Sequence, residues 1–171
     1  MMFYKAMDEY VPDYVSVAFD LKGPTFRHKE YKDYKGIRKG MPPELVMQIQ
    51  PLKELLDTMG VHRAEIEGFE ADDIIGTLSK IGEDENLEVF ILTGDKNALQ
   101  LASKITKIFF IKKGISDLEV YDEDKVKERY ELTPKQFIDL KRSSRSAGRT
   151  PASTTCRLPA EPYRSAASRS R

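Results

Sequence analysis

Five acidic side chains lie at the boundaries of apolar runs in this chain. Three of them fall within four residues, directly before an apolar pattern with helical spacing, and the other two close separate apolar runs. Crowded carboxylates repel one another unless a cation lies between them, and their oxygens are the ligands that Mg²⁺ prefers. We therefore predict a divalent-metal site for phosphate chemistry at the carboxyl edge of an α/β sheet. The five acids are Asp20, Glu70, Asp72, Asp73 and Asp95.

Each of these acids also has an ordinary structural explanation. Acids in the first turn of a helix complement the helix dipole, and aspartates after strands are common turn residues. Asp95 could in addition cap a short helix that starts at Lys96. Three acidic positions at three element ends favour a metal site, but composition alone leaves both explanations open.

Basic and aromatic side chains follow Asp20 in a second group, residues 26–39, which we call the basic segment. It holds six Lys or Arg, two acids and three aromatic rings. Cations for phosphates and rings for base stacking are the combination that holds single-stranded or frayed nucleic acid. A solvated surface helix is the alternative. The nearby Asp20 favours nucleic-acid binding, which we predict for Arg27, Lys29, Lys32, Tyr34, Lys35 and Arg38.

Hydrophobic periodicity divides the chain into alternating strands and helices. Strands are predicted at 14–19, 64–66, 88–92, 105–111 and 118–121. Helices are predicted at 1–8, 44–59, 71–81, 96–101, 122–130 and 134–141. Pro51 predicts a kink or a split in the second helix. The alternation predicts an α/β fold with a mainly parallel sheet and helices on both faces.

The charge balance changes abruptly near residue 142. Residues 1–141 hold 21 Lys or Arg and 27 acids, whereas residues 142–171 hold seven Arg and one acid, Glu161. We expect one domain at 1–141 and a disordered Arg/Ser-rich tail at 142–171, typical of out-of-frame sequence. No apolar run is long enough for a membrane helix. The single cysteine, Cys156, indicates a reducing, cytoplasmic location.

Four motifs in combination resemble the 5′→3′ exonuclease domain of bacterial DNA polymerase I, in the flap-endonuclease-like nuclease family. They are residues 19–29, 34–38, 67–78 and 93–101, and residues 132–141 extend the likeness. The resemblance implies a resolvase/PIN-like fold in which the five acids hold Mg²⁺ or Mn²⁺, as two ions. It also implies DNA with 5′ ends or flaps and RNA primer–DNA hybrids as substrates in replication and repair. Lys35 and Arg27 would be the catalytic phosphate contacts.

Three departures from the family pattern affect the expected activity. The family begins with a strand ending in an aspartate, it has an aspartate where Asn97 stands, and it continues past Lys141 into a helix-hairpin-helix. We therefore expect a fragment without the first strand and the helix-hairpin-helix, and with impaired nuclease activity. The alternative is a DNA-binding remnant without catalysis. A small phosphohydrolase is a third hypothesis, which the basic segment disfavours.

Overall fold

A computed structural model describes residues 2–31, 34, 40–111 and 118–139 of the 171-residue chain. The chain forms two compact units. One unit is Tyr4–Ile74, and the other is Ile75–Arg171 together with Met1–Phe3. The boundary falls inside one helix, so the units share a continuous backbone, and each is described by itself.

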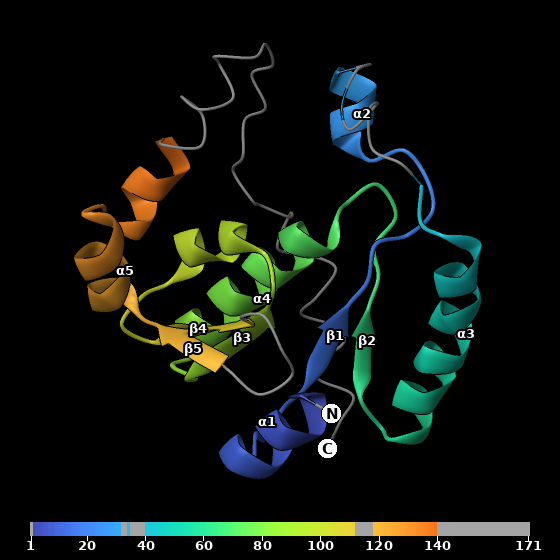
Figure 1. Cartoon of the computed structure of the whole chain (residues 1–171), viewed down its shortest axis with the longest axis horizontal. Coiled ribbons are helices and arrows are strands. Elements are labelled where there is room, and N and C mark those ends of the chain that lie inside the picture. The colour runs from blue at the N-terminus through green and yellow to red at the C-terminus, as the bar shows by residue number, and fades with distance from the viewer. Residues whose placement is uncertain (1, 32–33, 35–39, 112–117, 140–171) are drawn as a thin grey trace. The chain divides into compact units, whose positions relative to one another are not determined.

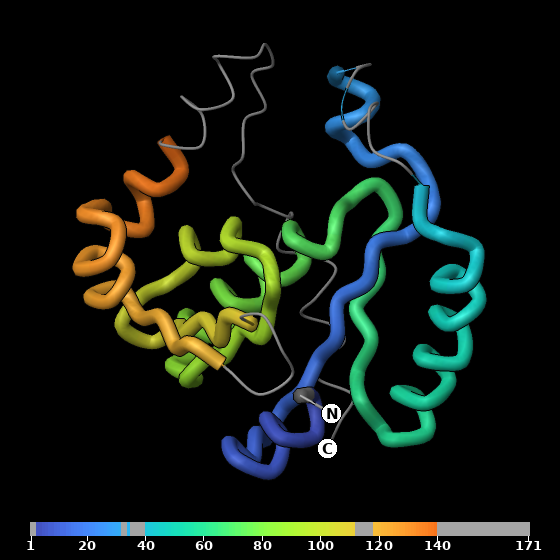
Figure 2. Tube along the Cα trace, in the orientation of Figure 1, coloured from blue at the N-terminus to red at the C-terminus, as the bar shows by residue number. Residues whose placement is uncertain are grey.

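The unit Tyr4–Ile74 is organised around a short pair of parallel strands. Its elements are α1 (Met2–Tyr10), β1 (Ser16–Ala18), α2 (Phe26–Glu30), α3 (Pro43–Thr58) and β2 (His62–Ala64). β1 pairs with β2 in register, and α3 lies along β2 (Figures 1 and 2). The amide of Phe19 donates to the carbonyl of Ala64 at 3.0 Å and extends the pairing. Because the strands are parallel, the segments that follow them leave from the same edge.

α3 is one uninterrupted helix with a proline in its interior. It starts with Pro43, where the missing amide has no intrahelical partner to lose, and it passes through Pro51. Two separate helices were one of the two predicted outcomes at this proline, and that alternative is wrong. Pro51 and Met47 are both exposed, so water can solvate the Met47 carbonyl that lacks its usual donor.

The second unit holds a three-stranded sheet with both parallel and antiparallel pairs. Its elements are α4 (Ala71–Asp84), which starts in the other unit, β3 (Val89–Thr93), the 3₁₀ helix η1 (Lys96–Leu101), β4 (Thr106–Ile111), β5 (Leu118–Tyr121), α5 (Glu123–Tyr130) and a helix at 134–139. β3 and β4 are parallel, and β4 and β5 are antiparallel. Ile108 lies opposite Ile91 on one side and Tyr121 on the other.

One face of this sheet forms the hydrophobic core of the unit. Ile91, Ile108 and Tyr121 are buried on it and form a cluster with side chains from the flanking helical segments. Those side chains are Leu99, Ala102, Val126 and Phe137. Each comes from a segment whose apolar spacing predicted a helix, apart from Ala102, which directly follows η1. Burial of these apolar side chains is what fixes η1, α5 and the 134–139 helix on the sheet.

The α/β class and the mainly parallel pairing are confirmed. In the described part of the chain, however, the strands form two small sheets, β1–β2 and β3–β4–β5. The second strand lies at His62–Ala64, two residues before its predicted start. The tail at 142–171 lies outside the described residues. Within the described ranges, no helix combines the length and apolar character needed to cross a membrane.

Close packing of α4 on β3 at Gly82 gives a test of this core. A β-carbon at Gly82 would lie 2.7 Å from Cγ2 of Val89, well inside contact distance. Overpacking costs about 1–3 kcal/mol, and the helix propensity of alanine returns about 1 kcal/mol. We therefore expect Gly82→Ala to lower the free energy of unfolding by about 1 kcal/mol in urea titrations.

Removing the clash partner provides the control. In a Val89→Ala background, Gly82→Ala should be neutral or stabilising, because the methyl group it meets is gone. An equal loss in both backgrounds would show that the contact with Val89 is not the cause.

Candidate functional site

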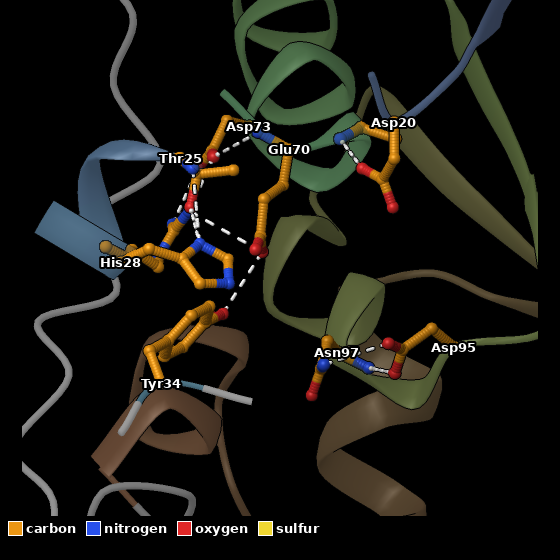
Figure 3. Close-up of polar contacts among 10 residues, drawn as sticks. Asp20, Thr25, His28, Tyr34, Glu70, Asp73, Asp95 and Asn97 are labelled. Carbon is orange, nitrogen blue, oxygen red and sulfur yellow. Dashed lines mark hydrogen bonds and ion pairs between the residues drawn. The ribbon is translucent and has the colours of Figure 1, made fainter. Parts of the chain in front are cut away.

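The start of α4 brings together acids from two parts of the chain. Asp20, which follows β1, accepts a hydrogen bond through Oδ1 from the amide of Ala71 at 2.6 Å, across 51 residues of sequence (Figure 3). Ala71 is the first residue of α4, where amides have no partner inside the helix and carry partial positive charge. Asp20 therefore caps the first amide of α4, that of Ala71, and the Asp20 side chain is exposed.

Asp73 satisfies a second amide at the same helix start. Its Oδ2 accepts a hydrogen bond from the amide of Glu70 at 3.1 Å, as the third helical residue does in a capping box. Asp73 is only 1% exposed and Glu70 only 8% exposed. Asp72, between them, is exposed in the first turn of α4. Consecutive acids of this motif therefore differ sharply in their access to solvent.

Arg27 of α2 neutralises the buried acids. Its Nη1 and Nη2 donate to Oδ2 and Oδ1 of Asp73 at 2.6 and 2.7 Å, and its Nη1 lies 3.7 Å from Oε2 of Glu70. Arg27 itself is only 5% exposed. The hydrogen bonds with Asp73, followed by the charges of Asp73 and Glu70, raise the pKa of the Arg27 guanidinium above its usual value. The pair is thus a buried, bidentate salt bridge.

Polar and aromatic contacts connect the basic segment to Glu70. The Tyr34 hydroxyl donates to Oε2 of Glu70 at 3.1 Å, and the Tyr34 ring meets the His28 ring edge-on at 5.1 Å. Nδ1 of His28 lies 2.8 Å from Oγ1 of Thr25, at the start of α2 (Figure 3). These contacts hold Tyr34 beside an acidic residue that lies 36 positions later in the chain.

Asp95, in the second unit, caps the helix that follows it. Its Oδ1 accepts from the amide of Asn97 at 2.8 Å and its Oδ2 accepts from Nδ2 of Asn97 at 2.9 Å. Asp95 is the N-cap of η1, so the structural role considered from the sequence is confirmed. Asn97, which replaces the aspartate expected from the family resemblance, therefore donates two hydrogen bonds to the carboxylate of Asp95.

The predicted metal ligands thus have protein partners in this structure. Among the described residues, no three side chains of Asp, Glu, His or Cys form a group that could hold a metal ion. The oxygen chemistry of the acids suits a hard cation. A metal site of Asp20, Glu70, Asp72, Asp73 and Asp95 stays a prediction.

The predicted phosphate contacts divide into two groups. Lys29 is exposed on α2, whereas Arg27 is buried on Asp73. Lys32, Lys35 and Arg38 lie outside the described residues. The sequence did not predict the pairing of Arg27 with Asp73, because 46 residues separate them and no local spacing relates them. An excess of neighbouring acids next to a helix start was the one available signal that a protein cation lies nearby.

The cap from Asp20 to α4 can be tested by changing its acceptor. Loss of a capping side chain typically costs about 1 kcal/mol. We expect Asp20→Ala to lower the free energy of unfolding by about that amount, and Asp20→Asn to lower it less, because the amide oxygen still accepts from Ala71. Equal losses for the two variants in urea titrations would assign the effect to the charge of Asp20 rather than to its hydrogen bond.

Comparison with known proteins gives consistent matches in sequence. Residues 1–131 match the family described as 5′-3′ exonuclease, N-terminal resolvase-like domain. DNA polymerase I of Bacillus subtilis (strain 168) is 46% identical over 141 residues, and that of Bacillus caldotenax is 45% identical over 141 residues. Each match covers 82% of this chain and 16% of the relative, so the chain spans about a sixth of the length of these polymerases.

Solved structures of the bacteriophage T5 5′-exonuclease share the fold. A mutant of that enzyme superposes with a TM-score of 0.66 at 19% identity, covering 81% of this chain and 51% of the enzyme. The zinc-bound enzyme gives a TM-score of 0.63 at 21% identity, covering 81% and 54%. The resolvase/PIN-like fold is therefore confirmed. With the family match over residues 1–131, these findings show that the chain belongs to the 5′-3′ exonuclease family, as its N-terminal resolvase-like domain.

Proposed function

We propose that this chain acts on DNA as part of a divalent-metal-dependent 5′→3′ exonuclease and flap endonuclease, which hydrolyses phosphodiesters at 5′ ends. The observation that carries the proposal is the acidic start of α4. Asp20, which follows β1, accepts a hydrogen bond from the first amide of α4, so it lies at the same helix start as Asp72 and Asp73 of the first turn. The helix dipole favours negative charge there, and Tyr34 of the basic segment donates a hydrogen bond to Glu70, the residue before α4.

Mg²⁺ or Mn²⁺ is the proposed cofactor, held as two ions by Asp20, Glu70, Asp72 and Asp95. Asp73, the fifth predicted acid, is paired with Arg27. The T5 5′-exonuclease has been solved with divalent zinc ions, and the oxygen donors of this chain suit harder cations of the same charge. Such cations, when bound, stabilise the negative charge that develops on a phosphodiester during hydrolysis. The contribution of this chain's own residues is to place exposed carboxylates at the start of α4.

The proposed substrates are DNA with 5′ ends or flaps and RNA primer–DNA hybrids, in primer removal and repair. The relatives are DNA polymerases, and the T5 flap endonuclease has been solved with DNA and metal ions. In this chain Lys29 presents an exposed cation on α2, one turn from Thr25. Lys32, Lys35 and Arg38 continue the series of cations in sequence and are proposed phosphate contacts.

We expect the activity to be low. Asn97 is neutral where the family resemblance implies an aspartate, and Arg27 neutralises Asp73, so fewer negative charges remain to attract cations. The second hypothesis, a DNA-binding protein without catalysis, draws on the engagement of Asp73 by Arg27 and of Asp95 by Asn97.

Flap cleavage separates the two hypotheses. We expect the purified chain to cut a 5′-labelled flap duplex slowly with Mg²⁺ or Mn²⁺ and not at all with EDTA. Asp72→Asn should lower the rate at least about tenfold by removing an exposed carboxylate at the site. Asp84→Asn, at the other end of α4, is the matched control and should leave the rate unchanged. Binding of the flap without cleavage under all these conditions would support the non-catalytic alternative.

A further inference from the structure

We propose that Arg27 and Asp73 form an internal clamp that positions α2 against the first turn of α4. In this assignment Asp73 is not a cation ligand and Arg27 is not a phosphate contact, although both belong to motifs that predict those roles. The inference rests on the proposed function only where it names the ligands that these two side chains do not bind, a divalent cation and a phosphate. The clamp itself follows from the contacts of the two side chains.

The carboxylate of Asp73 is largely saturated by protein donors. It accepts two hydrogen bonds from the Arg27 fork at 2.6 and 2.7 Å and a third from the amide of Glu70 at 3.1 Å. An ionised carboxylate offers about four lone-pair sites, and Asp73 is 1% exposed. A cation that used Asp73 would have to break the bidentate pair and leave a buried guanidinium without its partner, which is strongly unfavourable.

Aromatic and backbone contacts around Arg27 hold its side chain in place as well. Its guanidinium lies 4.5 Å from the centre of the Phe26 ring, and the rings of Phe26 and Phe69 lie 5.7 Å apart. The amide of Phe26 donates to the carbonyl of Gly68 at 2.9 Å. An ion pair, an aromatic pair and a backbone hydrogen bond therefore join α2 to the turn that leads into α4. A phosphate in solvent cannot reach a side chain buried at this junction.

Neighbouring residues supply matched exposed counterparts. Lys29 is exposed two positions after Arg27 on α2, and Asp72 is exposed one position before Asp73 on α4. Successive residues of a helix point about 100° apart. On α2 and on the first turn of α4, one charged side chain is therefore buried while a neighbouring one is exposed. We assign phosphate binding on α2 to Lys29, and cation binding in this pair of aspartates to Asp72.

A crossed experiment tests the arginine. Arg27→Met/Asp73→Leu removes both charges together, so it should leave unchanged the salt dependence of binding to a 5′-flap duplex. Arg27→Lys keeps the charge but loses the planar fork, so it should lower the urea midpoint of unfolding. Lys29→Ala should do the reverse, with an unchanged midpoint and a salt slope reduced by about one unit. A reduced salt slope in Arg27→Met/Asp73→Leu, or an unchanged midpoint in Arg27→Lys, would overturn the assignment.

The aspartates are tested by the shift in melting temperature that Mn²⁺ produces relative to EDTA. Asp73→Asn should melt lower in both solutions but keep the Mn²⁺-induced increase. Asp72→Asn should lose most of that increase. If Asp73→Asn does not fold, Arg27→Met/Asp73→Leu removes both charges together, which buried pairs tolerate, and it should also keep the increase. Loss of the Mn²⁺ effect in either Asp73 variant would contradict the clamp.

Failure of the proposed function is distinguishable from failure of the clamp. A chain that binds neither Mn²⁺ nor the flap duplex would refute the function. The clamp would still be tested by a double-mutant cycle on stability, in which Arg27→Met and Asp73→Leu together lower the midpoint less than the sum of the single changes. Additive losses would refute the clamp.

Discussion

The buried salt bridge between Arg27 and Asp73 is the interaction on which the rest of the acidic region depends. Removing two charges from water costs several kcal/mol per ion, and only good geometry and further hydrogen bonds offset that cost. Both are present, as two short bonds and a third from the amide of Glu70. Loss of one partner from such a pair typically costs about 3–5 kcal/mol. The pair thereby holds α2, Glu70 and the first turn of α4 in one arrangement.

Around this pair, the same acids serve both folding and the proposed chemistry. Asp20 and Asp73 satisfy amides at the start of α4, and Asp95 satisfies the amide of Asn97 at the start of η1. A helix start attracts carboxylates by its dipole, and a cluster of carboxylates attracts divalent cations. Burial decides between the two uses: Asp73 is closed off by Arg27, whereas Asp20 and Asp72 remain exposed.

Features set by local hydrogen bonds were predictable from the sequence, and those set by distant partners were not. Asp122 caps α5 and Thr133 forms a capping box with Gln136, as their positions indicate. The metal hypothesis identified the acids that lie at the start of α4. It did not predict the hydrogen bond from the amide of Ala71 to Asp20. That contact and the one from Arg27 to Asp73 close loops of 51 and 46 residues, which no periodicity encodes. The sequence left open whether the helix that contains Pro51 is kinked or split, because solvent exposure rather than local sequence decides whether the proline is tolerated.

We infer that the exposed acids at the start of α4, Asp20 and Asp72, form a site for a divalent cation. Paramagnetic broadening of backbone amide NMR signals by substoichiometric Mn²⁺ tests it most directly, since the effect falls steeply with distance from the ion. We expect the amides of residues 20, 71 and 72 to broaden first as Mn²⁺ is added. Broadening confined to other parts of the chain, or no selective broadening at all, would contradict it.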